Sequence, residues 1–180
     1  NLYLLPAGSP PHRGVPQATV QQRLDMLQLA RREFPLLRVD DRETRRDGPS
    51  YMVDTLRELR QELPNRSLSL LIGQDVANQL HSWHQWRQLF VLANIVVLTR
   101  PDTRTHYPRE LAEQILPRLV PAVSDLHKSS AGAVLYLEVE AIDISASKIK
   151  SYIGSGRSCG AMLPAAVMRY IRDKRLYLNA

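Results

Sequence analysis

The chain has 180 residues, and its hydrophobic content of 44% is enough for one domain with a substantial core and too high for a disordered protein. No apolar run reaches the ~18 residues of a membrane span, and the single cysteine, Cys159, excludes an internal disulfide framework, so we expect a cytoplasmic protein. The formal net charge of +6 comes without a basic stripe interleaved with aromatic residues. This pattern favours a small phosphate-bearing ligand over nucleic acid or a membrane surface.

Apolar runs alternate with amphipathic stretches along the chain. In chain order, the apolar runs predict strands at residues 2–5, 36–39, 68–72, 95–98 and 133–137. The amphipathic stretches predict helices at residues 19–34, 50–63, 108–119, 145–153 and 164–176. This alternation is typical of parallel βαβ units and predicts an α/β fold with a doubly wound sheet. Ligands of such sheets bind beyond the carboxyl ends of the strands, so the segments that follow strands are the candidate site.

Local signals refine several of these elements. Thr19 with Gln22 forms a capping-box pattern before the first helix, and Ser82 with Gln85 forms a second one before Trp86. The run at 68–72 is apolar except for Ser69, which predicts a strand buried on both faces. Residues 102–107 and 125–132 are predicted to be surface loops.

The segment after the third predicted strand contains Gly73 and Asp75. A glycine at the end of a parallel strand lets a ligand approach the backbone, and an acidic side chain just beyond it can accept hydrogen bonds from ribose hydroxyls. The alternative is an ordinary turn in which Asp75 caps the next helix. Further on, Trp83 can stack on a flat ring, whereas Trp86 is expected in the core.

Two further segments carry positive charge after a predicted strand. His12 and Arg13 end a proline-rich loop and suit phosphate contact, although an exposed turn explains them equally well. The segment from Ser145 to Lys150 combines hydroxyl groups, a helix start and lysines, which predicts a polyphosphate site. The alternatives there are a capped surface helix or a Ser-x-x-Lys acyl-enzyme motif, and the other elements of that motif are missing from the sequence.

Taken together and in order, these segments make the chain similar to the bacterial nicotinate-nucleotide adenylyltransferases, which are Rossmann-like proteins of the nucleotidyltransferase superfamily. The resemblance covers nearly the whole sequence. Its anchors are Pro10-Pro11-His12-Arg13, Gln22-Arg23, Met26-Leu27, Leu29-Ala30, Asp40-Asp41-Arg42-Glu43, Arg46, Pro49-Ser50-Tyr51, Asp54-Thr55-Leu56, Ile72-Gly73-Gln74-Asp75, Trp83, Arg100-Pro101, Ile144-Ser145-Ala146-Ser147 and Leu163-Pro164.

The resemblance implies transfer of AMP from ATP to nicotinate mononucleotide, with release of pyrophosphate and with Mg²⁺ accompanying ATP. It also implies roles for individual residues. The nicotinate-mononucleotide site is expected to include His12, Arg13, Tyr51, Met52, Trp83, His84 and Arg100. The ATP site is expected to include Gly73, Asp75, Ile144, Ser145, Ser147 and Lys150. No protein metal site, nucleic acid or membrane partner is expected, and a homo-oligomer is left open.

The sequence departs from the family pattern in three ways. The family's Gly-Gly-Thr-Phe-Asp-Pro-x-His-x-Gly-His segment is not in this sequence, Met52 stands where the family usually has Thr, and Lys150 where it usually has Arg. We therefore expect residues 1–180 to be one adenylyltransferase domain that lacks the N-terminal central strand and its catalytic histidines, and that is inactive as printed. The alternatives are a non-catalytic module that binds pyridine nucleotide or ATP, and a sister adenylyltransferase acting on the amide nucleotide.

Overall fold

The computed structural model describes residues 1–8, 17–100 and 103–178. The chain divides into two compact units, Asn1–Ser50 with Ile142–Ala180, and Tyr51–Ala141. Each unit contains parallel strands and helices, which confirms the α/β class predicted from the sequence. That the two units form one domain stays a prediction. None of the helices described is both long and apolar enough to cross a bilayer.

The first unit contains a two-stranded parallel sheet, with β1 (Leu2–Leu4) paired to β2 (Leu37–Val39). Its helices are α1 (Val20–Arg31), the 3-10 turn η1 (Arg42–Arg45), α6 (Ala146–Gly154), η5 (Gly160–Met162) and α7 (Ala165–Asp173). The capping box predicted for α1 is confirmed, because the Thr19 hydroxyl accepts from the Gln22 N–H at 3.2 Å and the Gln22 side chain accepts from the Thr19 N–H at 2.8 Å. Tyr170 on α7 donates to Asp25 on α1 at 2.6 Å, and Cys159 is buried beside them in the core of this unit.

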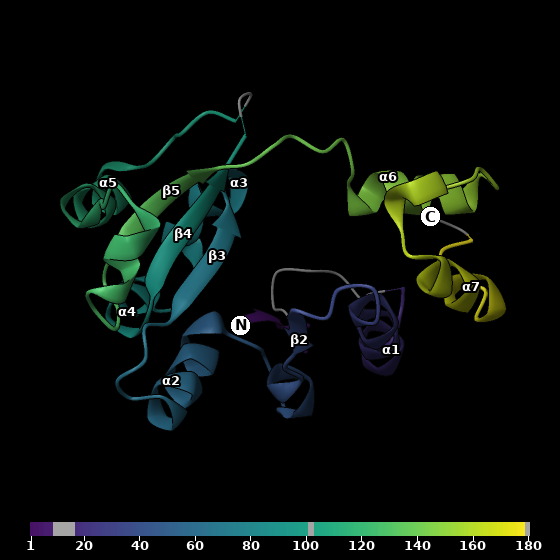
Figure 1. The fold of residues 1–180 in the computed structure, drawn as a ribbon, viewed down its shortest axis with the longest axis horizontal. Coiled ribbons are helices and arrows are strands. Elements are labelled where there is room, and N and C mark those ends of the chain that lie inside the picture. The colour runs from purple at the N-terminus through teal and green to yellow at the C-terminus, as the bar shows by residue number, and fades with distance from the viewer. Residues whose placement is uncertain (9–16, 101–102, 179–180) are drawn as a thin grey trace. The chain divides into compact units, whose positions relative to one another are not determined.

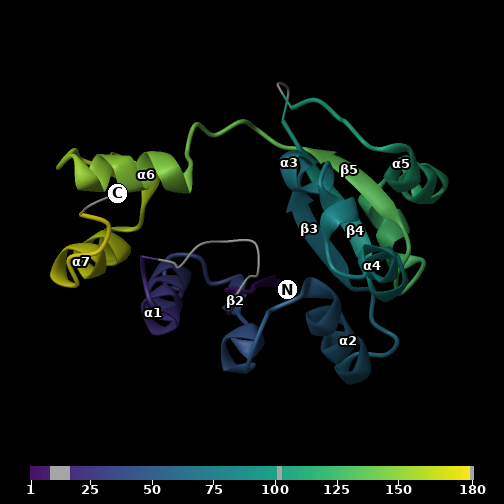
Figure 2. The ribbon, with the colours of Figure 1, turned by 180° about the vertical axis from the view of Figure 1, so that it is seen from behind.

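The second unit is built on a three-stranded parallel sheet in the order β3 (Ser69–Gly73), β4 (Asn94–Thr99), β5 (Val134–Glu138) (Figure 1). Its helices are α2 (Met52–Glu62), α3 (Gln74–Ala77), α4 (Trp86–Leu92) and α5 (Arg109–Ile115). Three 3-10 turns also belong to this unit: η2 (Leu80–Ser82), η3 (Leu116–Arg118) and η4 (Val123–His127). Figure 2 shows the same sheet from behind, with β4 again between its two neighbours.

The middle strand of this sheet is buried on both faces along most of its length. Ile95 and Val97 of β4 point into the main core, whereas Val96 packs against Leu126 on the opposite face. The prediction of two buried faces was wrong for β3, because it is an edge strand within its unit and its Leu71 is 43% exposed. A largely apolar run indicates a strand but does not distinguish a central strand from an edge strand.

Three local predictions in this unit also need correction. Ser82 does not cap the helix of Trp86, because its hydroxyl donates to the carbonyl of Gln79 and α4 begins after Gln85. The stretch at 125–132 is not a simple surface loop, since Leu126 is buried. The stretch at 102–107 likewise ends in Tyr107, which packs against the main core.

The polar side chain of Asn94, at the start of β4, has no exposed surface. Its amide donates to the Ser67 hydroxyl and to the Leu126 carbonyl, both at 3.0 Å, and it accepts from the Ala133 N–H at 2.9 Å. Replacing Asn94 by an apolar residue leaves its buried partners without a hydrogen bond. Each unsatisfied buried group costs about 1–3 kcal/mol of stability. We therefore expect Asn94→Leu to lower the free energy of unfolding by about 2 kcal/mol or more.

Tryptophan fluorescence during urea unfolding measures this effect, because Trp83 and Trp86 are the only tryptophans of the sequence and both lie in the second unit. Ser67→Ala is the graded control, since it removes one partner of Asn94 and leaves the Ala133 contact in place. An Asn94→Leu protein as stable as the parent protein would contradict this account of the core.

Candidate nucleotide-binding site

The carboxyl ends of β3 and β4 bring together three of the expected site residues. Gly73, the last residue of β3, is paired in register with Leu98 of β4. Arg100 follows the end of β4 and is exposed, and Asp75 lies in the first turn of α3 and is exposed as well. Because the strands are parallel, Gly73, Asp75 and Arg100 belong to one edge of the sheet, as predicted.

The backbone at Gly73 is open on the side where a side chain would stand. Its φ is −71°, so its conformation does not require glycine, and an added Cβ would meet no described atom within 4 Å. Neither backbone strain nor crowding inside the described chain explains the glycine, and the open backbone leaves room for a ligand to approach closely. Gly73 itself is the N-cap of α3, so the alternative in which Asp75 caps this helix was wrong.

An aromatic group lies at the start of α2. The rings of Tyr51 and His84 stack with centroids 4.3 Å apart and an angle of 32° between their planes. Trp83 precedes His84 in extended backbone and is half-buried, whereas Trp86 is buried in the core as predicted. Tyr51 and His84 therefore come together from segments that are separated in sequence, and Trp83 is the chain neighbour of His84.

The N-terminus of α2 carries free hydrogen-bond donors beside this aromatic group. Tyr51 is its N-cap, and no side chain of the described residues caps the helix. Met52 and Val53 are the first two residues of α2, and α2 extends over 11 residues. The unpaired N–H groups and the aligned peptide dipoles make such an end attractive to an anion. Such an end can bind an anion through backbone donors alone, without the hydroxyl that Met52 lacks.

The backbone next to His84 is held in an unusual conformation. Gln85 is left-handed, with a φ of 50°, which costs a residue other than glycine of order 1 kcal/mol. Arg57 of α2 hydrogen-bonds the side chains of both Gln85 and Gln88 and also pairs with Asp54 at 2.8 Å. Arg57 thus connects α2 to the segment that carries Trp83 and His84. No pattern in the sequence predicts this role.

The expected triphosphate residues lie on α6 in the first unit. Ser145 caps this helix, accepting from the Lys148 N–H at 3.1 Å, and the Lys148 ammonium pairs with Asp143, which raises the lysine pKa. These contacts make Ser145 and Lys148 a helix cap, so they speak against the acyl-enzyme alternative. Ser147 is exposed, and the half-buried Lys150 ammonium lies 5.2 Å from the centre of the Tyr177 ring. Ile144 precedes the cap and is 40% exposed.

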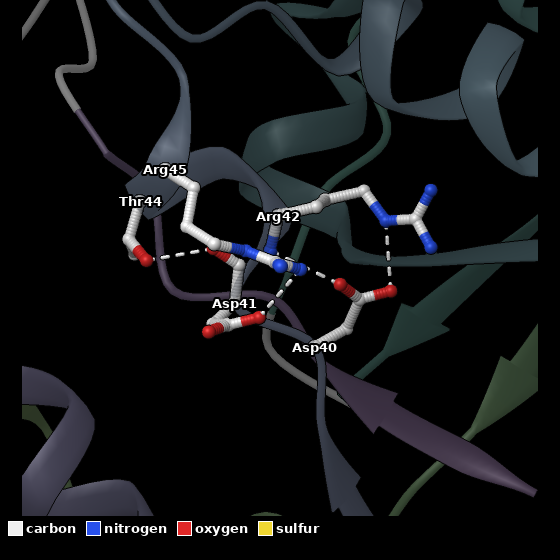
Figure 3. Close-up of polar contacts among 5 residues, drawn as sticks. All are labelled: Asp40, Asp41, Arg42, Thr44 and Arg45. Carbon is white, nitrogen blue, oxygen red and sulfur yellow. Dashed lines mark hydrogen bonds and ion pairs between the residues drawn. The ribbon is translucent and has the colours of Figure 1, made fainter.

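Polar contacts fix the segments that follow β1 and β2 in the same unit. Asp40 accepts from the Arg42 guanidinium at 2.8 Å and Asp41 pairs with Arg45 at 2.9 Å. Figure 3 draws both contacts. A side chain on Gly8 would meet the Glu43 carbonyl oxygen at 2.2 Å, so glycine is needed for this close approach.

Arg23 of α1 holds the chain on the other side of Gly8, by donating to the carbonyls of Ala7 and Gly8 at 2.5 and 3.1 Å. The loop that begins there contains His12 and Arg13, which lie outside the described residues.

Comparison with known proteins assigns the chain to a family. A family model described as cytidylyltransferase-like matches residues 2–151, which defines the chain as a nucleotidyltransferase of that class. A probable nicotinate-nucleotide adenylyltransferase of Aeromonas hydrophila is 40% identical over 177 residues, covering 98% of this chain and 83% of the relative. Another, from Halorhodospira halophila, is 41% identical over 176 residues, covering 98% and 81%. The chain belongs to the nicotinate-nucleotide adenylyltransferase family.

A solved structure supports the fold. The nicotinic acid mononucleotide adenylyltransferase of Plasmodium falciparum, complexed with NaAD, matches with a TM-score of 0.71 over 97% of this chain and 81% of that chain. Its sequence identity is 11%, so this similarity concerns the fold alone. The nucleotidyltransferase fold expected from the sequence is thereby confirmed.

Proposed function

We propose that this protein transfers the adenylyl group of ATP to nicotinate mononucleotide, giving nicotinate adenine dinucleotide and pyrophosphate. The observation that carries this proposal is the uncapped N-terminus of α2 beside Tyr51, Trp83 and His84. A pyridine carboxylate needs a flat apolar surface for its ring and hydrogen-bond donors for its charge, and this group of residues offers both. Family membership supports the proposal, and the two functions that the sequence left open gain no such support.

The proposed chemistry needs no nucleophile from the protein. A phosphate oxygen of nicotinate mononucleotide attacks the α-phosphorus of ATP, the bond to the bridging oxygen of the β-phosphate breaks, and pyrophosphate leaves with that electron pair. Such a reaction is accelerated by positioning and by neutralising charge. We assign the pyridine nucleotide to Tyr51, Met52, Trp83 and His84, with His12, Arg13 and Arg100 near its phosphate.

We assign ATP to the remaining expected residues. Gly73 and Asp75 face its ribose, and Ile144, Ser145, Ser147 and Lys150 meet its adenine side and triphosphate. Mg²⁺ accompanies ATP, whose phosphates supply the oxygen ligands that this ion prefers. Within the part of the chain that is described, no group of three or more His, Cys, Asp or Glu side chains is arranged to hold a metal ion. The cytoplasmic location and the absence of nucleic acid and membrane partners stay predictions.

Turnover by the full-length protein tests the proposal. We expect ATP, Mg²⁺ and nicotinate mononucleotide to give dinucleotide and pyrophosphate in equal amounts, measured by chromatography and by a coupled pyrophosphate assay. Phosphopantetheine in place of nicotinate mononucleotide should give no product. Binding of both nucleotides without any product would instead support a non-catalytic binding module.

The ring site gives a specific expectation for Trp83. Stacking is worth about 0.5–1.5 kcal/mol beyond area burial, so Trp83→Ala should raise the KM for nicotinate mononucleotide about tenfold. The KM for ATP should change less. Trp86→Phe is the matched control, because Trp86 lies in the core and its loss should lower thermal stability without changing the pyridine-side KM. An unchanged pyridine-side KM in Trp83→Ala would reassign Trp83 to core packing.

A further inference from the structure

Gln74 stands between the two residues assigned to the ATP ribose, and it points inward rather than toward a ligand. It is only 2% exposed, so its amide needs partners inside the protein. Its Nε2 donates to the Asn78 Oδ1 at 2.9 Å and to the Tyr107 hydroxyl at 3.1 Å. Its Oε1 accepts from the Thr105 hydroxyl at 3.4 Å. Gln74 thus makes one hydrogen bond to Asn78 at the end of its own helix and two to the segment that follows β4.

The segment 103–107, which follows β4, also contacts β5 and Asn78. The Tyr136 hydroxyl on β5 donates to the Tyr107 hydroxyl at 2.7 Å. Burial, together with this contact, raises the pKa of Tyr136, so its hydroxyl keeps its proton at physiological pH. Asn78 donates to the Arg104 carbonyl and accepts from the His106 N–H, both at 3.0 Å. All of these contacts lie within the second unit.

These contacts join two parts of the proposed site. Gly73 and Asp75 flank Gln74, and Arg100 precedes the segment 103–107, to which it is linked by its carbonyl accepting from the Thr103 N–H at 3.0 Å. We propose that Gln74, through Tyr107, is a positioning residue that sets Asp75 relative to the chain carrying Arg100. This inference rests on the proposed function for the identity of the ligand, but the coupling between the two segments is independent of it.

An apolar side chain at position 74 would fill the same space but would make no hydrogen bond to Asn78, Thr105 or Tyr107. Hydrogen bonds between neutral groups contribute about 0.5–1.5 kcal/mol each, and Gln74→Leu loses more than one of them. In the full-length protein we therefore expect Gln74→Leu to raise the KM for ATP about tenfold. The KM for nicotinate mononucleotide should rise less, because Arg100 is only one of the groups assigned to that nucleotide and the aromatic group does not depend on these bonds. Gln61→Leu, an exposed site on α2, is the matched control.

A double-mutant cycle with Tyr107→Phe separates positioning from general loss of stability. If Gln74 acts through the Tyr107 hydroxyl, the double variant should bind ATP no more weakly than Gln74→Leu alone. Amide hydrogen exchange gives a second measurement that needs no turnover, and it should increase at residues 74–78 and 103–107 together in either single variant, with residues 52–62 unchanged. Tyr136→Phe serves if Gln74→Leu does not fold, since it removes only the hydroxyl that donates to Tyr107.

Two results would overturn the inference. Equal increases in both KM values would show a general effect on folding, and exchange that increases at 74–78 without 103–107 would show that the two segments are not coupled. A parent protein that makes no dinucleotide would instead count against the proposed function, and the exchange measurement would still decide whether Gln74 couples these segments.

Discussion

Lys150→Glu is expected to lower kcat of the full-length protein by about 100-fold, the typical cost of removing one preorganised group that stabilises charge in the transition state. Lys150 lies in the second turn of α6, whose N-terminus begins at the Ser145 cap and carries the positive end of the helix dipole. A glutamate at this position would place negative charge beside the proposed triphosphate. Steady-state rates at saturating nucleotide measure the effect.

Two other variants show whether the effect comes from charge at this position. Lys150→Arg keeps the charge and adds a bidentate fork, so it should preserve or raise kcat. Lys174→Glu makes the same charge reversal at an exposed site of the same unit and should leave kcat within about twofold, as expected for a surface substitution. If Lys150→Glu were kinetically silent, Lys150 would be a surface lysine whose main contact is the Tyr177 ring.

The order and type of the main elements could be predicted from the sequence because their hydrophobic periods are clear. The strand expected at 68–72 is observed as Ser69–Gly73, and the helix expected at 19–34 is observed as Val20–Arg31. Both differences are at the ends, where capping and turns compete with the repeating pattern. The exposure of Leu71 could not be predicted, because the neighbours of a strand are set by the topology of the sheet and not by the composition of the strand.

The arrangement of three of the expected site residues at one sheet edge could be predicted because it follows from the parallel topology. Gly73 ends a strand, and Asp75 and Arg100 lie just beyond strand ends. Parallel strands bring their carboxyl ends to one edge of the sheet, independently of side-chain packing. The bond between Gln74 and Tyr107 joins residues 33 positions apart, and Tyr107 and Tyr136 are 29 positions apart. No local sequence pattern predicts contacts between residues so far apart in the chain. The one local signal is a glutamine that directly follows an apolar strand, and the motif around it indicates a function for its neighbours Gly73 and Asp75.

The left-handed Gln85 also escaped prediction, and the false capping box shows why. Ser82 and Gln85 have the right spacing for a cap, but the intervening Trp83 is in extended backbone and Gln85 has a positive φ. Arg57 supplies side-chain contacts that hold this conformation. The capping-box spacing considers only residues 82–85. The conformation of Gln85 also depends on Arg57, which lies on α2.

Preference for the acid over the amide nucleotide is the second large effect that we expect. The nicotinate carboxylate carries a charge that the amide lacks, and charge-assisted hydrogen bonds are about twice as strong as neutral ones. The free N–H groups at the start of α2 would therefore discriminate between the two nucleotides by tens-fold in kcat/KM. Met52 offers no hydroxyl to this anion, so Met52→Thr should widen the preference further.

Side-by-side measurement of kcat/KM for nicotinate mononucleotide and its amide tests the central claim most directly, because it examines the substrate and the residues that recognise it in one ratio. Both nucleotides are titrated at fixed, saturating ATP and Mg²⁺, and dinucleotide is quantified by chromatography. We expect the acid to be preferred by tens-fold, from the difference between charge-assisted and neutral hydrogen bonds. Equal values, or a preference for the amide, would contradict the assignment of the α2 N-terminus as a carboxylate site and would favour the sister adenylyltransferase.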